Sequence, residues 1–232
     1  MTRLQLLAAP LLVLATLSPA IAQTAPAVLK AKAGKPFVHK PSGMTLPPEL
    51  IGIPRASGHE YAAPQLDIAF RYVAPGNDEE ISVYVYRATA GVPAVWFDAA
   101  LRSVESRQNF GRFSRIDMPA PFAPPGQTVA IGMRAGWTLS NGPYRSTALA
   151  IVPVGEWLVK LRFSSASTEA ASLLRRLDDA IAGLGWPAAA TTAIAALPVS
   201  ECTTPLKLSG DSQAAVEDGA AEPQVVAPLD PD

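Results

Sequence analysis

Three segments of alternating polarity, separated by two short turns, constrain the fold of this chain most strongly. Residues 127–140, 143–153 and 157–164 each place apolar side chains at every second position, which is the spacing of a β-strand. Asn141-Gly142 is a typical hairpin turn, and Val154-Gly155-Glu156 reverses the chain again. We therefore expect an antiparallel meander here.

In the rest of the chain, predicted strands and predicted helices form separate groups along the sequence. The sequence predicts a hairpin over 37–46, strands over 65–74 and 80–89, a helix from Pro93 to about Asn109, and a second helix from an N-cap at Ser167 to about Gly183. Apolar side chains on both faces of 80–89 predict a central strand. Hairpin-linked strands with segregated helices indicate a single α+β domain with a central antiparallel sheet flanked by two main helices. An all-β barrel with one C-terminal helix is the alternative.

The N-terminus has the layout of a secretory signal peptide. Arg3 precedes the apolar run from Leu4 to Leu17, and Ala20-Ile21-Ala22 is a small-x-small cleavage site. We expect cleavage after Ala22 and a periplasmic or secreted protein; an uncleaved N-terminal membrane anchor is the alternative. No other segment has the roughly 20 apolar residues that a spanning helix needs.

Composition divides the rest of the chain. Residues 23–36 are predicted to be a linker and 37–186 the folded domain, while Ala, Pro and acidic residues in 187–232 predict a disordered tail. Residues 23–186 carry 17 Lys+Arg and 13 Asp+Glu, whereas 187–232 carry one Lys and seven Asp+Glu. This charge distribution argues against nucleic-acid binding, which needs a clustered basic face.

Several phrases resemble a known family. These are Phe37-Val38-His39-Lys40-Pro41-Ser42-Gly43, Leu46-Pro47, Arg71-Tyr72-Val73 and Val83-Tyr84-Val85-Tyr86-Arg87. In this order they resemble the Mog1/PsbP-like group of α/β/α sandwiches, and exported bacterial members most. The resemblance implies a central antiparallel sheet between helices and a role in binding or stabilising other proteins. It implies no functional residue, because no position matches a defined site.

Motifs for common chemistries do not stand out. The only histidines are His39 and His59, and with Glu60 their spacing matches no metal-ligand pattern. No Gly-x-Ser-x-Gly motif is present for serine chemistry. The single cysteine, Cys202, cannot form an internal disulfide. We expect no metal and no cofactor.

The best candidate site is a set of cations that alternate with apolar positions on the predicted strands. In an antiparallel sheet they would converge, with Asp67 beside them, into a basic patch for a small anionic ligand or for an acidic region of another envelope protein. The alternative is an ordinary solvated sheet face held by cross-strand pairs. The candidates are Arg71, Arg134, Arg145, Lys160 and Arg162.

These observations favour an exported, non-enzymatic binding or accessory protein of the cell envelope. The competing hypothesis is an enzyme with an unusual, histidine-poor site. A cleft lined by Asp or Arg residues with perturbed pKa values would favour the enzyme. A flat, charged sheet face would favour the interaction hypothesis.

Overall fold

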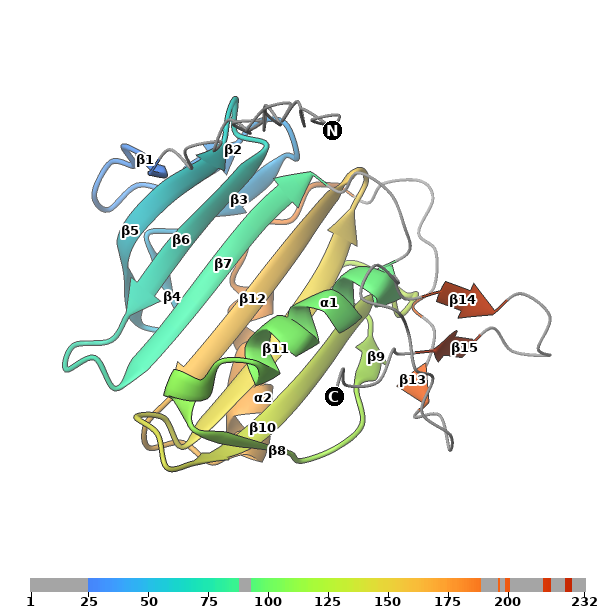
Figure 1. Cartoon of the computed structure of the whole chain (residues 1–232). Coiled ribbons are helices and arrows are strands. Elements are labelled where there is room, and N and C mark those ends of the chain that lie inside the picture. Colours follow the sequence, from blue (N-terminus) through green and yellow to red (C-terminus); the bar gives the residue numbers. More distant parts are fainter. Residues whose placement is uncertain are drawn as a thin grey trace, which may run out of the picture.

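A ten-stranded antiparallel sheet with one main helix on each face forms the body of the protein (Figure 1). The computed structural model describes residues 25–87, 93–188, 196, 199–200, 215–217 and 224–226. The strand order is β1-β5-β6-β7-β12-β11-β10-β8, with β4 paired to β5 and β9 to β10. Its strands are β1 (Ala27–Val28), β4 (Glu49–Leu50), β5 (Ile53–Ala62), β6 (Asp67–Val73), β7 (Glu79–Arg87), β8 (Arg112–Arg115), β9 (Ala120–Phe122), β10 (Gly132–Ser140), β11 (Ser146–Val154) and β12 (Trp157–Ser165).

In the described part of the chain, the two α-helices are α1 (Pro93–Glu105) and α2 (Ala170–Ala182), and a 3-10 turn, η1 (Gln108–Phe110), follows α1. A separate hairpin pairs β2 (Phe37–His39) with β3 (Met44–Leu46). The predicted α+β class is confirmed, as is the meander, which is β10-β11-β12. The barrel alternative is wrong, because β1 and β8 end the described sheet without pairing to each other.

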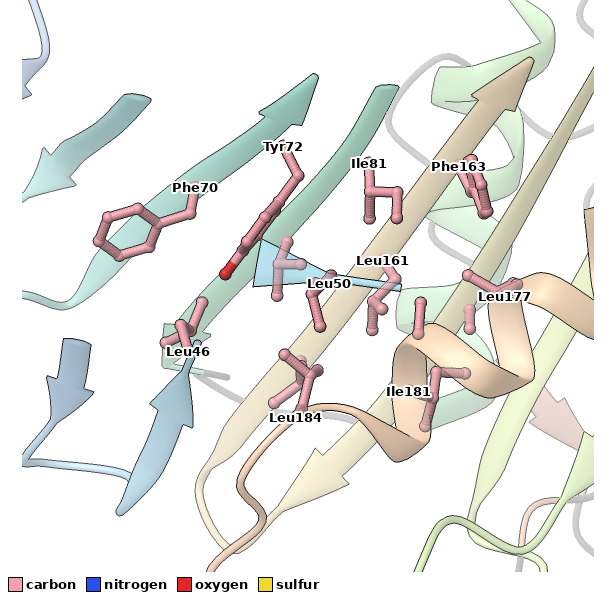
Figure 2. Close-up of a cluster of buried hydrophobic side chains, with 14 of the residues drawn as sticks. Leu46, Leu50, Phe70, Tyr72, Ile81, Leu161, Phe163, Leu177, Ile181 and Leu184 are labelled. Atoms are coloured by element: carbon pink, nitrogen blue, oxygen red, sulfur yellow. The ribbon is translucent and has the colours of Figure 1, made fainter. Parts of the chain in front are cut away.

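The larger core lies between the sheet and α2 (Figure 2). Here every second side chain of β6, β7 and β12 points toward the helix. The side chains named at the end of this paragraph are each at most 1% exposed. The hairpin β2-β3 and β4 close the same layer. The side chains include Leu46, Leu50, Phe70, Tyr72, Ile81, Leu161, Phe163, Leu177 and Ile181.

The smaller core lies on the opposite face, under α1. Phe97, Leu101 and Val104, the predicted apolar stripe of this helix, are buried against β10 and β11. Trp137 and Ile151 on those strands are completely buried. Figure 1 shows α1 lying over the meander strands, with β5 and β6 to one side of it. Among the described residues, no helix covers the half of this sheet face that β5 and β6 form.

Some boundaries differ from the sequence-based expectation. The ten-residue strand β5 was not predicted, because its polar and small residues lack an alternating pattern. Part of the expected linker, Ala27–Val28, pairs with β5 as an edge strand. The predicted N-cap Ser167 is wrong: Glu169 occupies that position without a side-chain cap bond. Instead, Ser165 Oγ accepts hydrogen bonds from the backbone N–H groups of residues 167 and 168.

The expected signal peptide, residues 1–22, lies outside the described residues, as does most of the expected tail from 187 onward. Within that tail, Ala196 packs on the smaller core and donates its backbone N–H to Ala130 O. Three short strands also pair there: β13 (Val199–Ser200), β14 (Ala215–Glu217) and β15 (Gln224–Val226). None of the helices in the described part of the chain has the length and apolar character needed to cross a membrane.

Candidate ligand-binding cleft

A cleft of about 380 Å³ opens where α1 meets the uncovered half of the sheet. Its walls combine aromatic rings from the strands with small side chains from the helix, and its charged groups are one lysine and one aspartate. Ligand sites in proteins commonly have this composition, an apolar wall with few polar groups. The lining residues are Tyr61, Asp67, Tyr84, Tyr86, Trp96, Ala99, Ala100, Ser103 and Lys160.

Strand register brings the charged and aromatic groups together. Lys160 on β12 is paired with Tyr84 on β7, and Asp67 on β6 is paired with Tyr86 two residues further along β7. Side chains at every second position share a face, so both tyrosines stand between the lysine and the aspartate. Lys160 Nζ lies 4.3 Å from the ring centroid of Tyr84 and 5.7 Å from that of Tyr86. These cation–π contacts hold the ammonium over the tyrosine faces.

Burial opposes the charge of both ionisable groups. It lowers the pKa of Lys160, and Arg107 and Arg162 lower it further, while Asp67 acts in the opposite sense. Burial likewise raises the pKa of Asp67, and the attraction of Lys160 offsets only part of this effect. No ion pair joins Asp67 and Lys160 within the described residues. Each group is therefore left in a site that disfavours its charge.

Asp67 also has an unmet hydrogen-bonding need. Its Oδ1 is buried and accepts no hydrogen bond from any group in the described part of the chain. Tyr86 does not donate to this oxygen, although burial and the nearby Asp67 raise the pKa of that phenol to about 12 and so keep its proton in place. A buried acceptor without a donor destabilises the protein by about 1–3 kcal/mol. A donor supplied by a ligand would remove that penalty.

Two more predicted cations lie on the same face, beside the cleft. Arg162 follows Lys160 on β12 and lies 4.9 Å from the Phe110 ring centroid, and burial lowers its pKa. Arg162 Nη2 is 3.8 Å from Glu80 Oε1, and Arg71 Nη2 donates to Glu80 Oε2 over 2.6 Å. Arg71 and Arg162 therefore share one carboxylate, and Lys160 is the predicted cation that lines the cleft itself.

Arg134 and Arg145 do not join this group. On β10, Arg134 is paired with Ala150, whereas Met133 is paired with Ile151, the residue opposite Lys160. Arg134 therefore points to the α2 face, where it forms an ion pair with Asp178. Arg145 lies in the turn before β11 and pairs with Glu169 at the start of α2. The expectation that all five cations converge was wrong because it ignored which residues of each strand face the same side.

The histidines serve as packing and hydrogen-bonding groups. His39 is fully buried; its Nε2–H donates to Gln65 O over 2.9 Å and its Nδ1 accepts from Ser42 Oγ over 2.7 Å. His59 lies on β5 and takes no part in the hydrogen bonds of His39. Among the described residues, no three His, Cys, Asp or Glu side chains are grouped closely enough to hold a metal ion. Cys202 lies outside the described residues.

Sequence reasoning missed the aromatic part of the site. Tyr84 and Tyr86 were correctly assigned to one face of a central strand. Tyr61 was missed because it lies on β5, which was not predicted. Trp96 was missed because the sequence of α1 does not show where that helix lies over the sheet. The signal available in the sequence was the pair Tyr84 and Tyr86 at alternate positions of one strand. The pairing of that strand with the one that carries Lys160 is seen only in the structure. This feature is a cleft with a perturbed Asp67 rather than a flat charged face.

Comparisons with known proteins give a similarity of fold but no sequence relative. No protein-family model matches the chain, and no curated protein sequence matches it. The fold is similar to the solution structure of cyanobacterial PsbP (CyanoP) from Synechocystis sp. PCC 6803, with a TM-score of 0.45 and 14% sequence identity. The match covers 74% of this chain and 99% of that one. This similarity concerns the fold alone.

Proposed function

We propose that this chain is an exported envelope protein that binds a small anionic ligand in the cleft between α1 and the sheet. The observation that carries the proposal is Lys160, a cation held over two tyrosine rings and lining a cleft with apolar walls. An anion placed there would compensate a charge that the site otherwise disfavours. The aromatic walls would cover the apolar body of the same ligand.

The geometry supports binding better than catalysis. A catalytic lysine or aspartate needs a nucleophile or a reacting proton within hydrogen-bond reach. In the described part of the chain, neither Asp67 nor Lys160 hydrogen-bonds a hydroxyl or a second carboxylate. The perturbed pKa of Asp67 favours the enzyme hypothesis, but burial beside a ligand cleft accounts for it without any reaction.

Calorimetric titration tests the binding proposal. The probes are 3-phenylpropionate and 4-methylpentanoate, two carboxylates with apolar bodies that the cleft has room to cover. We expect saturable binding to the wild type and at least a tenfold loss in Lys160→Met, since a charge-assisted contact contributes more than about 1.4 kcal/mol. Arg134→Gln is the matched control: it removes the same charge on the opposite face and should bind like the wild type. Equal affinities of wild type and Lys160→Met, or no binding, would contradict the proposal.

The export half of the proposal rests on residues 1–22 and is tested separately. Mass spectrometry of the protein purified from its native host should show a chain that begins at Gln23, in the periplasmic or secreted fraction. A chain that begins at Met1 and stays with the membrane would instead support the uncleaved anchor.

A further inference from the structure

We propose that the ligand of this cleft is an amino acid, with a protonated amine beside its carboxylate and an apolar side chain. The inference rests on the proposed function, because it assigns the carboxylate to Lys160. It goes further in giving Asp67 a role: its carboxylate would bind the ligand's ammonium group. The chemical class is therefore a zwitterion rather than an anion alone.

Asp67 is placed to bind a donor group of the ligand. Asp67 lines the same cleft as Lys160, and its buried Oδ1 lacks a hydrogen-bond donor among the described residues. Lys160 does not supply one, since its ammonium lies over the tyrosine rings and forms no ion pair with the carboxylate. An ammonium donates three hydrogen bonds, so a ligand amine would satisfy Oδ1 with a charge-assisted bond.

Asp67 and Lys160 are far enough apart for a small ligand to lie between them. Strand β7 lies between β6 and β12, so Asp67 and Lys160 are two strands apart, or about 10 Å across the sheet. Both side chains reach the same cleft from opposite sides of Tyr84 and Tyr86. A small ligand between them would meet an acceptor on one side and a cation on the other. A simple monoanion would satisfy the lysine and bring a second negative charge near Asp67.

The walls of the cleft indicate the chemical nature of the uncharged part of the ligand. Tyr61, Tyr84, Tyr86 and Trp96 provide rings, and Ala99 and Ala100 provide a small-residue surface on α1. A volume of about 380 Å³ has room for a large apolar side chain in addition to the two charged groups. Ring and methyl surfaces favour an aromatic or branched aliphatic side chain over a polar one.

The experiment compares probes that share one body and differ in their charged groups. L-Phenylalanine is compared with 3-phenylpropionate and 2-phenylethylamine, and L-leucine with 4-methylpentanoate and 3-methylbutylamine, each titrated into the full mature chain by calorimetry at neutral pH. In at least one series we expect the amino acid to bind about tenfold more tightly than the acid, as a charged hydrogen bond to Asp67 requires. The amine should bind more weakly still, because it would meet Lys160 without a countercharge.

Asp67→Asn keeps the shape of the side chain and removes its charge. It should reduce the preference for the amino acid over its acid to less than threefold, while circular dichroism confirms that the variant is folded. If the acids bind as tightly as the amino acids to the wild type, Asp67 does not bind an ammonium and the inference is overturned, while the proposed anion site stands. If no carboxylate binds, or if Lys160→Met binds like the wild type, the proposed function fails and the inference with it.

Discussion

Arg176 of α2 forms a two-point ion pair with Glu79, the first residue of β7. Both guanidinium Nη atoms donate to the carboxylate, with Nη2 to Oε2 at 2.7 Å, and Ser165 and Thr168 hydroxyls donate to the same group. The Glu79 side chain is 11% exposed and that of Arg176 is 34% exposed. This network fixes the start of α2 against the central strand of the sheet.

We expect Arg176→Met to destabilise the protein by about 2 kcal/mol. Removing one partner of a buried pair typically costs about 3–5 kcal/mol, and the partial exposure of Arg176 reduces that figure. Arg175→Met on the same helical turn is the control, because Arg175 is exposed and, among the described residues, donates only to Ser172. It should change the free energy of unfolding by less than about 0.5 kcal/mol. Urea unfolding of both variants provides the measurement, and equal losses would show that the pair is not specific.

The Glu79 carboxylate also makes the stability of the protein depend on pH in the acidic range. Arg176 lowers the pKa of Glu79 below its ordinary value of 4.5. Its contribution is therefore complete above about pH 4.5 and is lost as the pH falls through the lowered value. The free energy of unfolding of the wild type should fall more steeply below pH 4.5 than that of Arg176→Met. Parallel curves for the two proteins would contradict this origin of the acid sensitivity.

His39 should produce a second, separate pH dependence. Burial lowers the pKa of this imidazole below 6.5, so it is neutral in the folded protein and becomes charged more readily in the unfolded chain. Stability is then complete above pH 6.5 and declines as the pH falls below it. His39→Gln should flatten unfolding free energies measured between pH 7 and 5. NMR titration of the imidazole protons, assigned with His59→Gln, should give a midpoint below 6.5 for His39; a midpoint above 6.5 would be inconsistent with the buried neutral form.

Gly58 on β5 has no room for a side chain. A Cβ added there would overlap the edge of the Phe70 ring, which is fully buried between sheet and hairpin. Gly58→Ala should destabilise the protein by about 1–3 kcal/mol through overpacking. The loss should be smaller in a Phe70→Leu background, where the ring is absent. A double-mutant cycle by thermal unfolding measures this, and simple additivity would mean that the two residues do not compete for space.

Ligand binding should weaken at alkaline pH. Because burial and neighbouring arginines lower the pKa of Lys160, its ammonium is lost at a lower pH than the ordinary 10.5. As the pH is raised, the affinity for 3-phenylpropionate should therefore begin to decrease before pH 10.5 is reached. Tyr86, with a pKa of about 12, is still neutral there. Calorimetry across this range measures the midpoint. A constant affinity up to pH 10.5 would contradict an ammonium that is buried in the cleft.

Much of the fold was predictable because local signals agreed with tertiary packing. Alternation at Ile81, Val83 and Val85 gave the central strand, and helical spacing at Phe97 and Leu101 gave the buried face of α1. The strand β5 could not be predicted, since Gly58 and its polar neighbours owe their extended conformation to pairing with β6 rather than to a hydrophobic pattern.

The site was predictable only in part. Lys160 and Asp67 could be chosen as charged positions on strands, but their common cleft depends on the strand order β6-β7-β12, in which β12 is distant in the sequence. The same long-range pairing determines that Arg134 faces α2 instead. Face assignments across a sheet require the register, and the register is a property of the folded protein.

Chemical-shift mapping can locate the ligand on the protein residue by residue. The ¹H–¹⁵N spectrum of residues 23–232 is recorded during titration with 3-phenylpropionate and with L-phenylalanine. If the cleft is the binding site, the largest saturable shifts fall on Tyr84, Tyr86 and Lys160 and on residues 96–103 of α1, and they are absent in Lys160→Met. Saturable shifts confined to the α2 face around Arg134, or no saturable shift with either probe, would show that this cleft is not the binding site.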